Sequence, residues 1–112
     1  MLYLSNAFSI NMLNFGLDAG RAPEVQFRPI SYADAMDLLS GEFTSAVGHT
    51  DTAAIISDLL NRSVTANRIS VKLGLGDSIL VAQFTGPRLP EGTTTLPEGA
   101  SIQFLLCTIN YW

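Results

Sequence analysis

The sequence has little of what most secreted and metal-binding domains require. Its 112 residues include one cysteine, Cys107, and one histidine, His49. A lone cysteine cannot close an intramolecular disulfide, and no Cys/His cluster has the spacing of a zinc site. Cys107 lies inside an apolar stretch, so we interpret it as a packing residue. This low cysteine content fits a reducing compartment, and we expect a cytoplasmic protein without a metal or cofactor.

Charge and long apolar runs are also scarce. No run approaches the roughly 18 apolar residues of a membrane span, and the N-terminus lacks the basic region of a signal peptide. Only 14% of residues are charged against 47% hydrophobic, which indicates that a partner, most simply a second copy, covers apolar surface. The net charge of −4 argues against non-specific DNA binding. Five of the six basic residues are arginine, which favours oriented contacts to a small anion.

Familiar catalytic motifs are absent as well. The chain has no HExxH, GxSxG, GxxxxGK[ST] or GxGxxG pattern, which argues against the common hydrolase and nucleotide-binding classes. What remains is a set of polar or cationic residues at the expected ends of elements: Asn6, Ser9, His49, Asn67, Arg68, Arg88 and Glu91. Among them, Arg68, Arg88 and His49, together with a helix N-terminus, make a candidate anion site, and they do not specify the anion.

Alternating strand-like and helix-like segments predict one α/β (α+β) domain over residues 1–112, with a mixed sheet of about five strands flanked by two or three helices. Strands are expected at 2–5, 24–30, 42–48, 68–73, 79–84 and 102–112, and helices at 10–16, 31–41 and 50–63. Ser31 is the expected cap of the second helix and Gly41 its stop, and Thr50 or Asp51 is the expected cap of the third. Pro29 marks the end of a strand or an edge strand.

Residues 68–84 show the pattern of a hairpin with a turn at "GLGD". The following stretch, 85–100, is rich in Pro, Gly and Thr and is expected to form one long irregular loop, whose length points to function. It repeats the string "LPEG" at 89–92 and 96–99, which predicts two similar turns.

Each candidate residue also has a plain structural interpretation. His49 is either a structural residue at a strand-to-helix junction or a group that delivers a proton near neutral pH. Arg88 is either a surface residue paired with Glu91 or a ligand contact held between two prolines. For Arg68 the alternative is a solvated edge charge, and for Asn6 and Ser9 it is helix capping.

Four blocks resemble the viral anti-CRISPR ring nucleases, small proteins of archaeal viruses, phages and some bacteria. They are "LSNAFSINML" (4–13), "AVGHTDTAAIISDLL" (46–60), "NRISVKL" (67–73) and "PRLPEG" (87–92), in the same order and over most of the chain. The resemblance implies a homodimer that binds cyclic tetra-adenylate, the second messenger of type III CRISPR systems. It also implies metal-independent cleavage to linear di-adenylate with a 2′,3′-cyclic phosphate, which switches off the signal.

The resemblance also assigns roles. His49, in the family's GH-x-x-T block, is implied to be the general acid, Arg88 to hold the scissile phosphate and Glu91 to orient that arginine. Arg68 is implied to contact the ligand, and its neighbours Asn67 and Ile69 are assigned to ligand binding with it. Asn6 and Ser9 are implied to bind ribose or phosphate. Pro87 departs from the family pattern, in which glutamine is common before the arginine.

Three hypotheses therefore remain open at the level of sequence. The first is a ring nuclease, in which His49 is needed for cleavage. The second is a binding protein that sequesters a cyclic nucleotide without turnover. The third is a small module that blocks a host protein through apolar surface.

Overall fold

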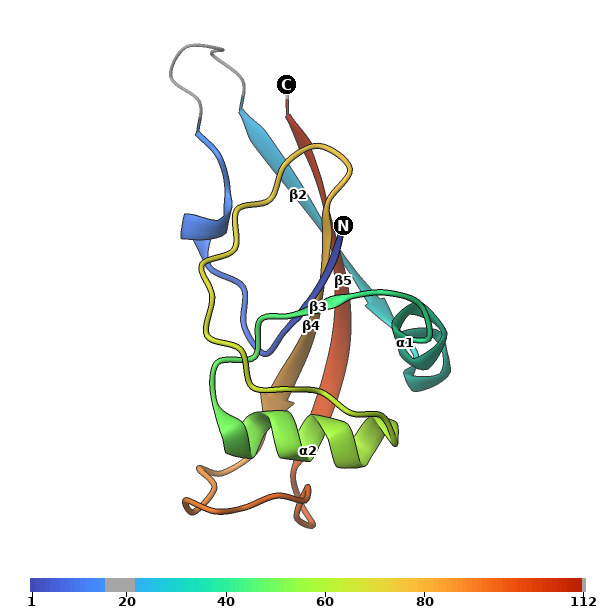
Figure 1. Ribbon diagram of the computed structural model, residues 1–112, viewed down its shortest axis with the longest axis vertical. Helices are drawn as coiled ribbons and strands as arrows, with labels where there is room; N and C mark the ends of the chain where they lie inside the picture. Colours follow the sequence, from blue (N-terminus) through green and yellow to red (C-terminus); the bar gives the residue numbers. More distant parts are fainter. Residues whose placement is uncertain (16–21, 112) are drawn as a thin grey trace.

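A five-stranded mixed sheet forms the framework of the protein. The computed structural model describes residues 1–15 and 22–111 (Figure 1). Its elements are β1 (Leu2–Ser5), the short 3-10 helix η1 (Ile10–Met12), β2 (Pro23–Ile30), α1 (Tyr32–Leu39), β3 (Thr44–Ser45), α2 (Thr50–Leu60), β4 (Ser78–Thr85) and β5 (Ser101–Tyr111). The predicted α+β class with a five-stranded mixed sheet and two or three helices is confirmed.

The strand order β2-β5-β4-β1-β3 brings distant segments to one edge of the sheet. Strand β1 pairs in parallel with β3 and with β4, while β5 runs antiparallel to β4 and β2. Parallel strands share one edge for their carboxyl ends, and α/β proteins bind ligands at such edges. Asn6 follows β1, His49 follows β3 and the 86–100 loop follows β4, so the topology gathers three of the predicted site segments.

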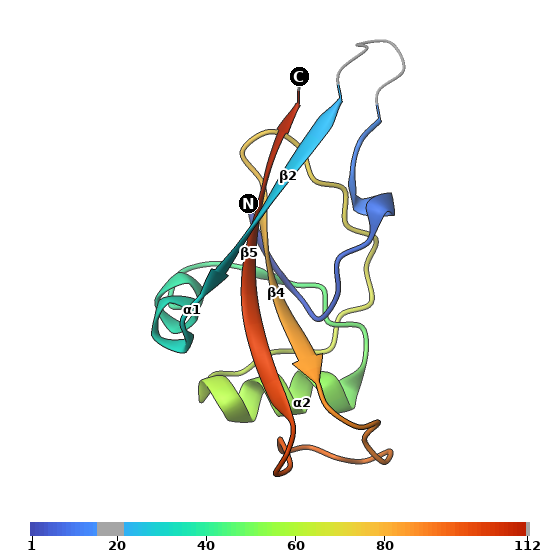
Figure 2. The ribbon, with the colours of Figure 1, turned by 180° about the vertical axis from the view of Figure 1, so that it is seen from behind.

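Two hydrophobic cores lie on opposite faces of the sheet. Helices α1 and α2 cover the first face, where Leu39 and Ile56 pack against Leu80 and Phe104. Figures 1 and 2 show this from two sides: α2 crosses in front of β4 and β5 in one view and behind them in the other. Irregular segments cover the second face with Leu13, Val71 and Leu73, which pack against Ile79, Val81, Cys107 and Ile109. Alternate residues of β4 therefore serve opposite cores.

Cys107 is a packing residue, as predicted. Its side chain is fully buried in the second core, and that burial raises the pKa of the thiol to about 11.

The helix ends agree in part with the predictions. Ser31 caps α1 as expected, since its hydroxyl accepts a hydrogen bond from the N–H of Asp34. The helix ends at Leu39, just before the predicted stop. The predicted cap of α2 was wrong: His49 takes that position instead of Thr50 or Asp51, because a ring nitrogen replaces the usual hydroxyl or carboxylate.

The predicted hairpin at 68–84 was wrong. Its second arm forms β4, but residues 68–72 form no strand, and the backbone of the first arm makes one isolated parallel bridge, from Leu73 to Leu13. The reason is that both sides of β4 are already paired, with β1 and with β5. The alternation of apolar residues at 69, 71 and 73 has another cause than strand pairing. Val71 and Leu73 are buried in the second core, while Ile69 is 41% exposed.

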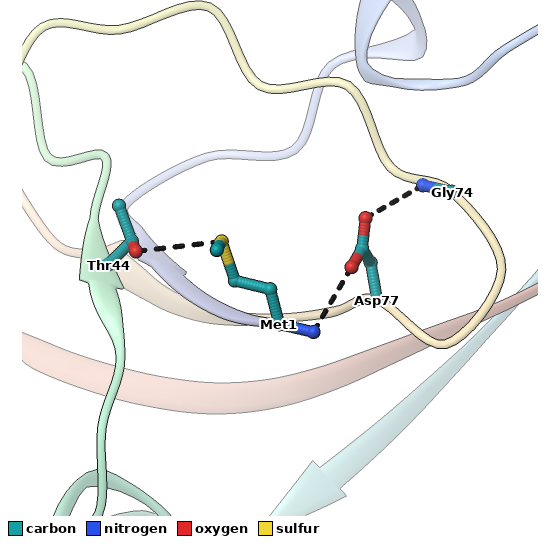
Figure 3. Close-up of polar contacts among 4 residues, drawn as sticks. All are labelled: Met1, Thr44, Gly74 and Asp77. Carbon is teal, nitrogen blue, oxygen red and sulfur yellow. Dashed lines mark hydrogen bonds and ion pairs between the residues drawn. The ribbon is translucent and has the colours of Figure 1, made fainter.

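The turn within that segment exists and leads into β4. Asp77 closes it by donating its N–H to the carbonyl of Gly74 and accepting the Gly74 N–H on its carboxylate at 2.9 Å. The other carboxylate oxygen lies 3.1 Å from the amino group of Met1, whose sulfur accepts a hydrogen bond from Thr44 (Figure 3). The hydrogen bond from Gly74 is the main cause of a lowered pKa of the Asp77 carboxyl.

Other predicted elements are shorter than expected. The strand at 42–48 is reduced to two residues of β3, and the helix at 10–16 is one 3-10 turn that ends at Met12. Its predicted stop, Gly16, lies outside the described residues. Strand β2 contains Pro23 and Pro29 and lies at the edge of the sheet, as Pro29 predicted.

The helices give no membrane span. Among the residues that the structure describes, no helix has the length and apolar character that crossing a bilayer requires.

The long irregular loop after β4 is present. No helix or strand interrupts residues 86–100, and the two "LPEG" strings form similar turns, as predicted. In each turn the glycine has a positive φ and the next residue donates its N–H to the proline carbonyl, Thr93 to Pro90 and Ala100 to Pro97.

Candidate functional site

A pocket of about 530 Å³ lies between the start of α2 and the 86–100 loop. The helix side is lined by His49, Asp51, Thr52 and Ile55, and the loop side by Arg88, Leu89, Pro90, Glu91 and Thr93. The structure thus brings together the three residues that the family resemblance assigned to catalysis, His49, Arg88 and Glu91. They come from two segments that only the tertiary fold makes neighbours.

His49 holds the first turn of α2. Its Nδ1 accepts a hydrogen bond from the N–H of Asp51 at 3.2 Å, and its carbonyl accepts the N–H of Ala53 at 3.0 Å. Since Nδ1 is an acceptor, the ring proton of the neutral imidazole is on Nε2. Nε2 has no hydrogen-bond partner among the described residues, so this nitrogen is available to a ligand. The structural and the catalytic interpretation of His49 therefore involve different ring nitrogens.

The side chains of Arg88 and Glu91 are exposed to solvent. Neither side chain has a hydrogen bond or ion pair with a described residue, and the two do not pair with each other. The expected surface pair between them is therefore not formed. Arg88 also lines an adjoining, more apolar cavity of about 300 Å³ with Asn6, Phe84 and Ile102. Asn6 thus lies on the Arg88 side of the site, as its position after β1 implies.

Arg68 and Asn67 lie beside the segment that leads to His49. A Cβ placed on Gly48 would lie 3.7 Å from Nε of Arg68, so the arginine side chain runs alongside the residue before His49. Asn67 is bound to the same segment: its N–H donates to the Val47 carbonyl and its side-chain amide to the Ser45 carbonyl, both at 2.7 Å. Arg68 is free to meet a ligand, while the amide group of Asn67 supports the fold.

Four predicted ligand contacts line neither the pocket nor the adjoining cavity: Asn67 and Arg68, described above, and Ser9 and Ile69. Ser9 caps η1 by accepting the N–H of Asn11 at 3.2 Å, which matches its plain interpretation as a capping residue. Ile69 is partly exposed and lines neither the pocket nor the adjoining cavity. Both could meet a ligand only if it extends beyond the pocket.

The charges in the pocket are mixed. Arg88 is opposed by the carboxylates of Asp51 and Glu91, and the first turn of α2 adds the partial positive charge of a helix N-terminus. Within residues 1–15 and 22–111, no group of three or more His, Cys, Asp or Glu side chains is placed to hold a metal ion.

Sequence reasoning missed the pocket role of Asp51. Its carboxylate accepts the N–H of Gly92 at 2.6 Å and so connects α2 to the loop. The position of Asp51 two residues after His49 was visible, but its partner is a backbone group far along the chain, which no side-chain pattern reveals.

Comparison with known proteins identifies the family. Residues 2–105 match the family described as STIV B116-like. The chain belongs to the STIV B116-like family. It is 31% identical over 93 residues to Uncharacterized protein 26 of Sulfolobus islandicus filamentous virus, an alignment that covers 82% of this chain and 74% of the relative. It is also similar in structure to B116 of Sulfolobus turreted icosahedral virus, with a TM-score of 0.71, 27% identity and coverage of 95% and 97% of the two chains. Both relatives of this STIV B116-like protein are proteins of archaeal viruses.

Proposed function

We propose that this STIV B116-like protein is a metal-independent ring nuclease that cuts cyclic tetra-adenylate into linear di-adenylate with a 2′,3′-cyclic phosphate. The 2′-hydroxyl of a ribose attacks its own 3′-phosphorus, loses its proton to a solvent base, and displaces the 5′-oxygen of the next nucleotide in line. His49 gives that leaving oxygen its proton. Because cleavage removes the messenger of type III CRISPR systems, the activity is anti-immune, which agrees with the viral relatives.

The observation that carries this proposal is the shared pocket of His49, Arg88 and Glu91. In-line attack by a neighbouring hydroxyl needs an acid for the leaving oxygen and a cation for the charge that grows on the phosphate. The pocket supplies an imidazole and a guanidinium from facing walls. Glu91 adds a carboxylate that can orient the guanidinium once a phosphate draws Arg88 inward.

The chemistry requires His49 to change its hydrogen bonding. An imidazolium carries protons on both nitrogens, so it cannot accept the N–H of Asp51. Protonation of His49 therefore breaks the cap of α2, and proton release to the leaving oxygen allows the cap to form again. A cap that breaks and re-forms in each cycle is compatible with an exposed helix end, where water can bind the free N–H.

The size of the ligand supports a dimer. A pocket of about 530 Å³ is in the range that holds one small ligand, and a ring of four nucleotides is larger. A two-fold dimer would present two such pockets to a ring with two-fold symmetry, and each His49 would face an opposite phosphate. Ser9 and Ile69, outside the pocket, would then contact the remainder of the ring.

The cap of α2 favours one alternative function. If the bond from Asp51 to Nδ1 of His49 persists in the complex, His49 stays neutral and the protein binds the ring without cutting it. Arg68, Arg88 and the helix N-terminus would then provide affinity alone.

Incubation with labelled cyclic tetra-adenylate in excess EDTA separates these functions. We expect wild type to produce di-adenylate with a cyclic phosphate and His49→Ala to bind the ring without cutting it. Glu91→Ala should slow cleavage, whereas Glu98→Ala, the same change in the second "LPEG" turn and outside the pocket, should not. A ring that stays intact on wild-type protein would establish sequestration instead.

A further inference from the structure

Asp51 contacts both walls of the pocket. Its backbone N–H donates to Nδ1 of His49, and its carboxylate accepts the N–H of Gly92 at 2.6 Å. Gly92 is the residue after Glu91 and belongs to the turn that begins at Pro90. One residue thus connects the proposed acid to the loop that carries the other two site residues.

This connection has no substitute elsewhere in the loop. Within the described chain, the bond from Gly92 to Asp51 is the single hydrogen bond that joins the 86–100 loop to a segment other than the two strands that flank it. The other hydrogen bonds of the loop are local, such as those from Thr93 to the Pro90 carbonyl. Without Asp51, the position of the loop relative to α2 depends on side-chain packing alone.

The second "LPEG" turn provides an internal comparison. It has the same backbone hydrogen bond and a glycine with nearly the same φ, 84° at Gly99 against 88° at Gly92. Yet the N–H of Gly99 has no partner among the residues that the structure describes. The local sequence therefore explains the turn in both cases, and Asp51 explains why only the first one is fixed to α2.

We propose that Asp51 is a positioning residue of this site, which fixes the 86–100 loop to α2 so that Arg88 and Glu91 face His49. The inference rests on the proposed ring nuclease function for its catalytic consequence. A charge-assisted bond to a backbone N–H is directional and strong, which suits a link that sets orientation. The side chain of Asp51 is needed for the link, whereas the cap of His49 uses the backbone, so a substitution separates the two contacts.

Three variants test the role. Asp51→Ala removes the link and keeps the cap, Asp51→Asn keeps an oxygen that can accept the same N–H, and Asp34→Ala removes a first-turn carboxylate from α1 as a matched control. For Asp51→Ala we expect the single-turnover rate at saturating cyclic tetra-adenylate to fall about 10- to 100-fold, the range that misplacement of reacting groups produces. Asp51→Asn should stay within about threefold of wild type and Asp34→Ala should match it.

Amide hydrogen exchange in the free protein checks the link independently of activity. In wild type we expect Gly92 to exchange more slowly than Gly99, and in Asp51→Ala the two should become alike. Equal exchange in wild type, or slow exchange of Gly92 that survives in Asp51→Ala, would overturn the link even if no ring is cut. Lost protection with an unchanged single-turnover rate would overturn the positioning role. Absence of cleavage by wild type would instead overturn the proposed function, and the exchange data would still decide the link.

Discussion

Asn67 is the site residue whose structural role and ligand-binding role are easiest to separate by experiment, because its side-chain amide already makes a hydrogen bond in the free protein. The side-chain Nδ2 donates to the Ser45 carbonyl at 2.7 Å, next to the backbone bond from Asn67 to Val47. Asn67→Ala removes the side-chain bond and leaves the backbone bond. The Ser45 carbonyl then loses this donor in a region where Ser45 itself is buried.

The expected loss follows from that geometry. One intramolecular hydrogen bond contributes about 1 kcal/mol, and a partner left unsatisfied in a buried setting raises the cost toward 2 kcal/mol. For a domain of this size, each kcal/mol corresponds to about 4 °C in Tm. We therefore expect Asn67→Ala to lower the Tm of the free protein by about 4 to 8 °C. Arg68→Ala, which removes an exposed side chain that has no hydrogen bond with a described residue, should stay within about 0.5 kcal/mol.

Thermal unfolding of the free variants gives the change in Tm, and ring-binding measurements on the same variants then separate the two roles. Loss of stability in Asn67→Ala, with weaker ring binding mainly in Arg68→Ala, agrees with the structural assignment. If Asn67→Ala keeps wild-type stability and loses ring binding, the amide is a ligand contact and the hydrogen bond to Ser45 contributes nothing.

Three further predictions concern the framework of the site. Gly86→Ala places a Cβ at a positive φ of 147° and 3.1 Å from Ala100, at the other end of the loop. We therefore expect urea unfolding to show a loss of about 1 to 3 kcal/mol in the free energy of unfolding. Gly41→Ala, the control with open space around the new Cβ, should stay within about 0.5 kcal/mol of wild type. Asp77 has a lowered pKa, chiefly because its carboxylate accepts the Gly74 N–H, so its contribution is complete above the ordinary aspartate pKa and is lost as the pH falls through the lowered value in the folded state. The stability difference between wild type and Asp77→Asn should therefore shrink between about pH 5 and about pH 2, and a constant difference would contradict this assignment. Burial, with a thiol pKa of about 11, should keep Cys107 unreactive toward a disulfide reagent at pH 8 until urea unfolds the chain, and fast reaction of the native protein would contradict its place in the core.

Local patterns predicted the elements whose signals are local. The Ser31 cap, the edge strand marked by Pro29 and the two "LPEG" turns depend on neighbouring residues, and the structure has them. The hairpin at 68–84 failed because the burial of Val71 and Leu73 produces the same alternation as a strand. Strand pairing is non-local, and the parallel partner of β4 is the N-terminal β1, which no turn signal announces.

The features of the site also divide into those that local sequence predicts and those that depend on non-local contacts. Chemistry-bearing residue types and their places at element ends were visible in the sequence, and the fold brings His49, Arg88 and Glu91 into one pocket. The cap by His49 and the link from Asp51 to Gly92 were not visible, because each depends on a backbone N–H, which every non-proline residue carries. Side-chain identity cannot show which of these groups a carboxylate or an imidazole will meet.

The proposed mechanism depends on proton transfer from His49 to the leaving 5′-oxygen, and a modified ring isolates this step. In a cyclic tetra-adenylate whose bridging 5′-oxygens are sulfur, the leaving thiolate needs no proton. We expect His49→Ala to be nearly inactive on the normal ring and to cut the sulfur-substituted ring at close to the wild-type rate. If His49→Ala is equally inactive on both rings, His49 is not the general acid, and its part in the protein is the cap of α2.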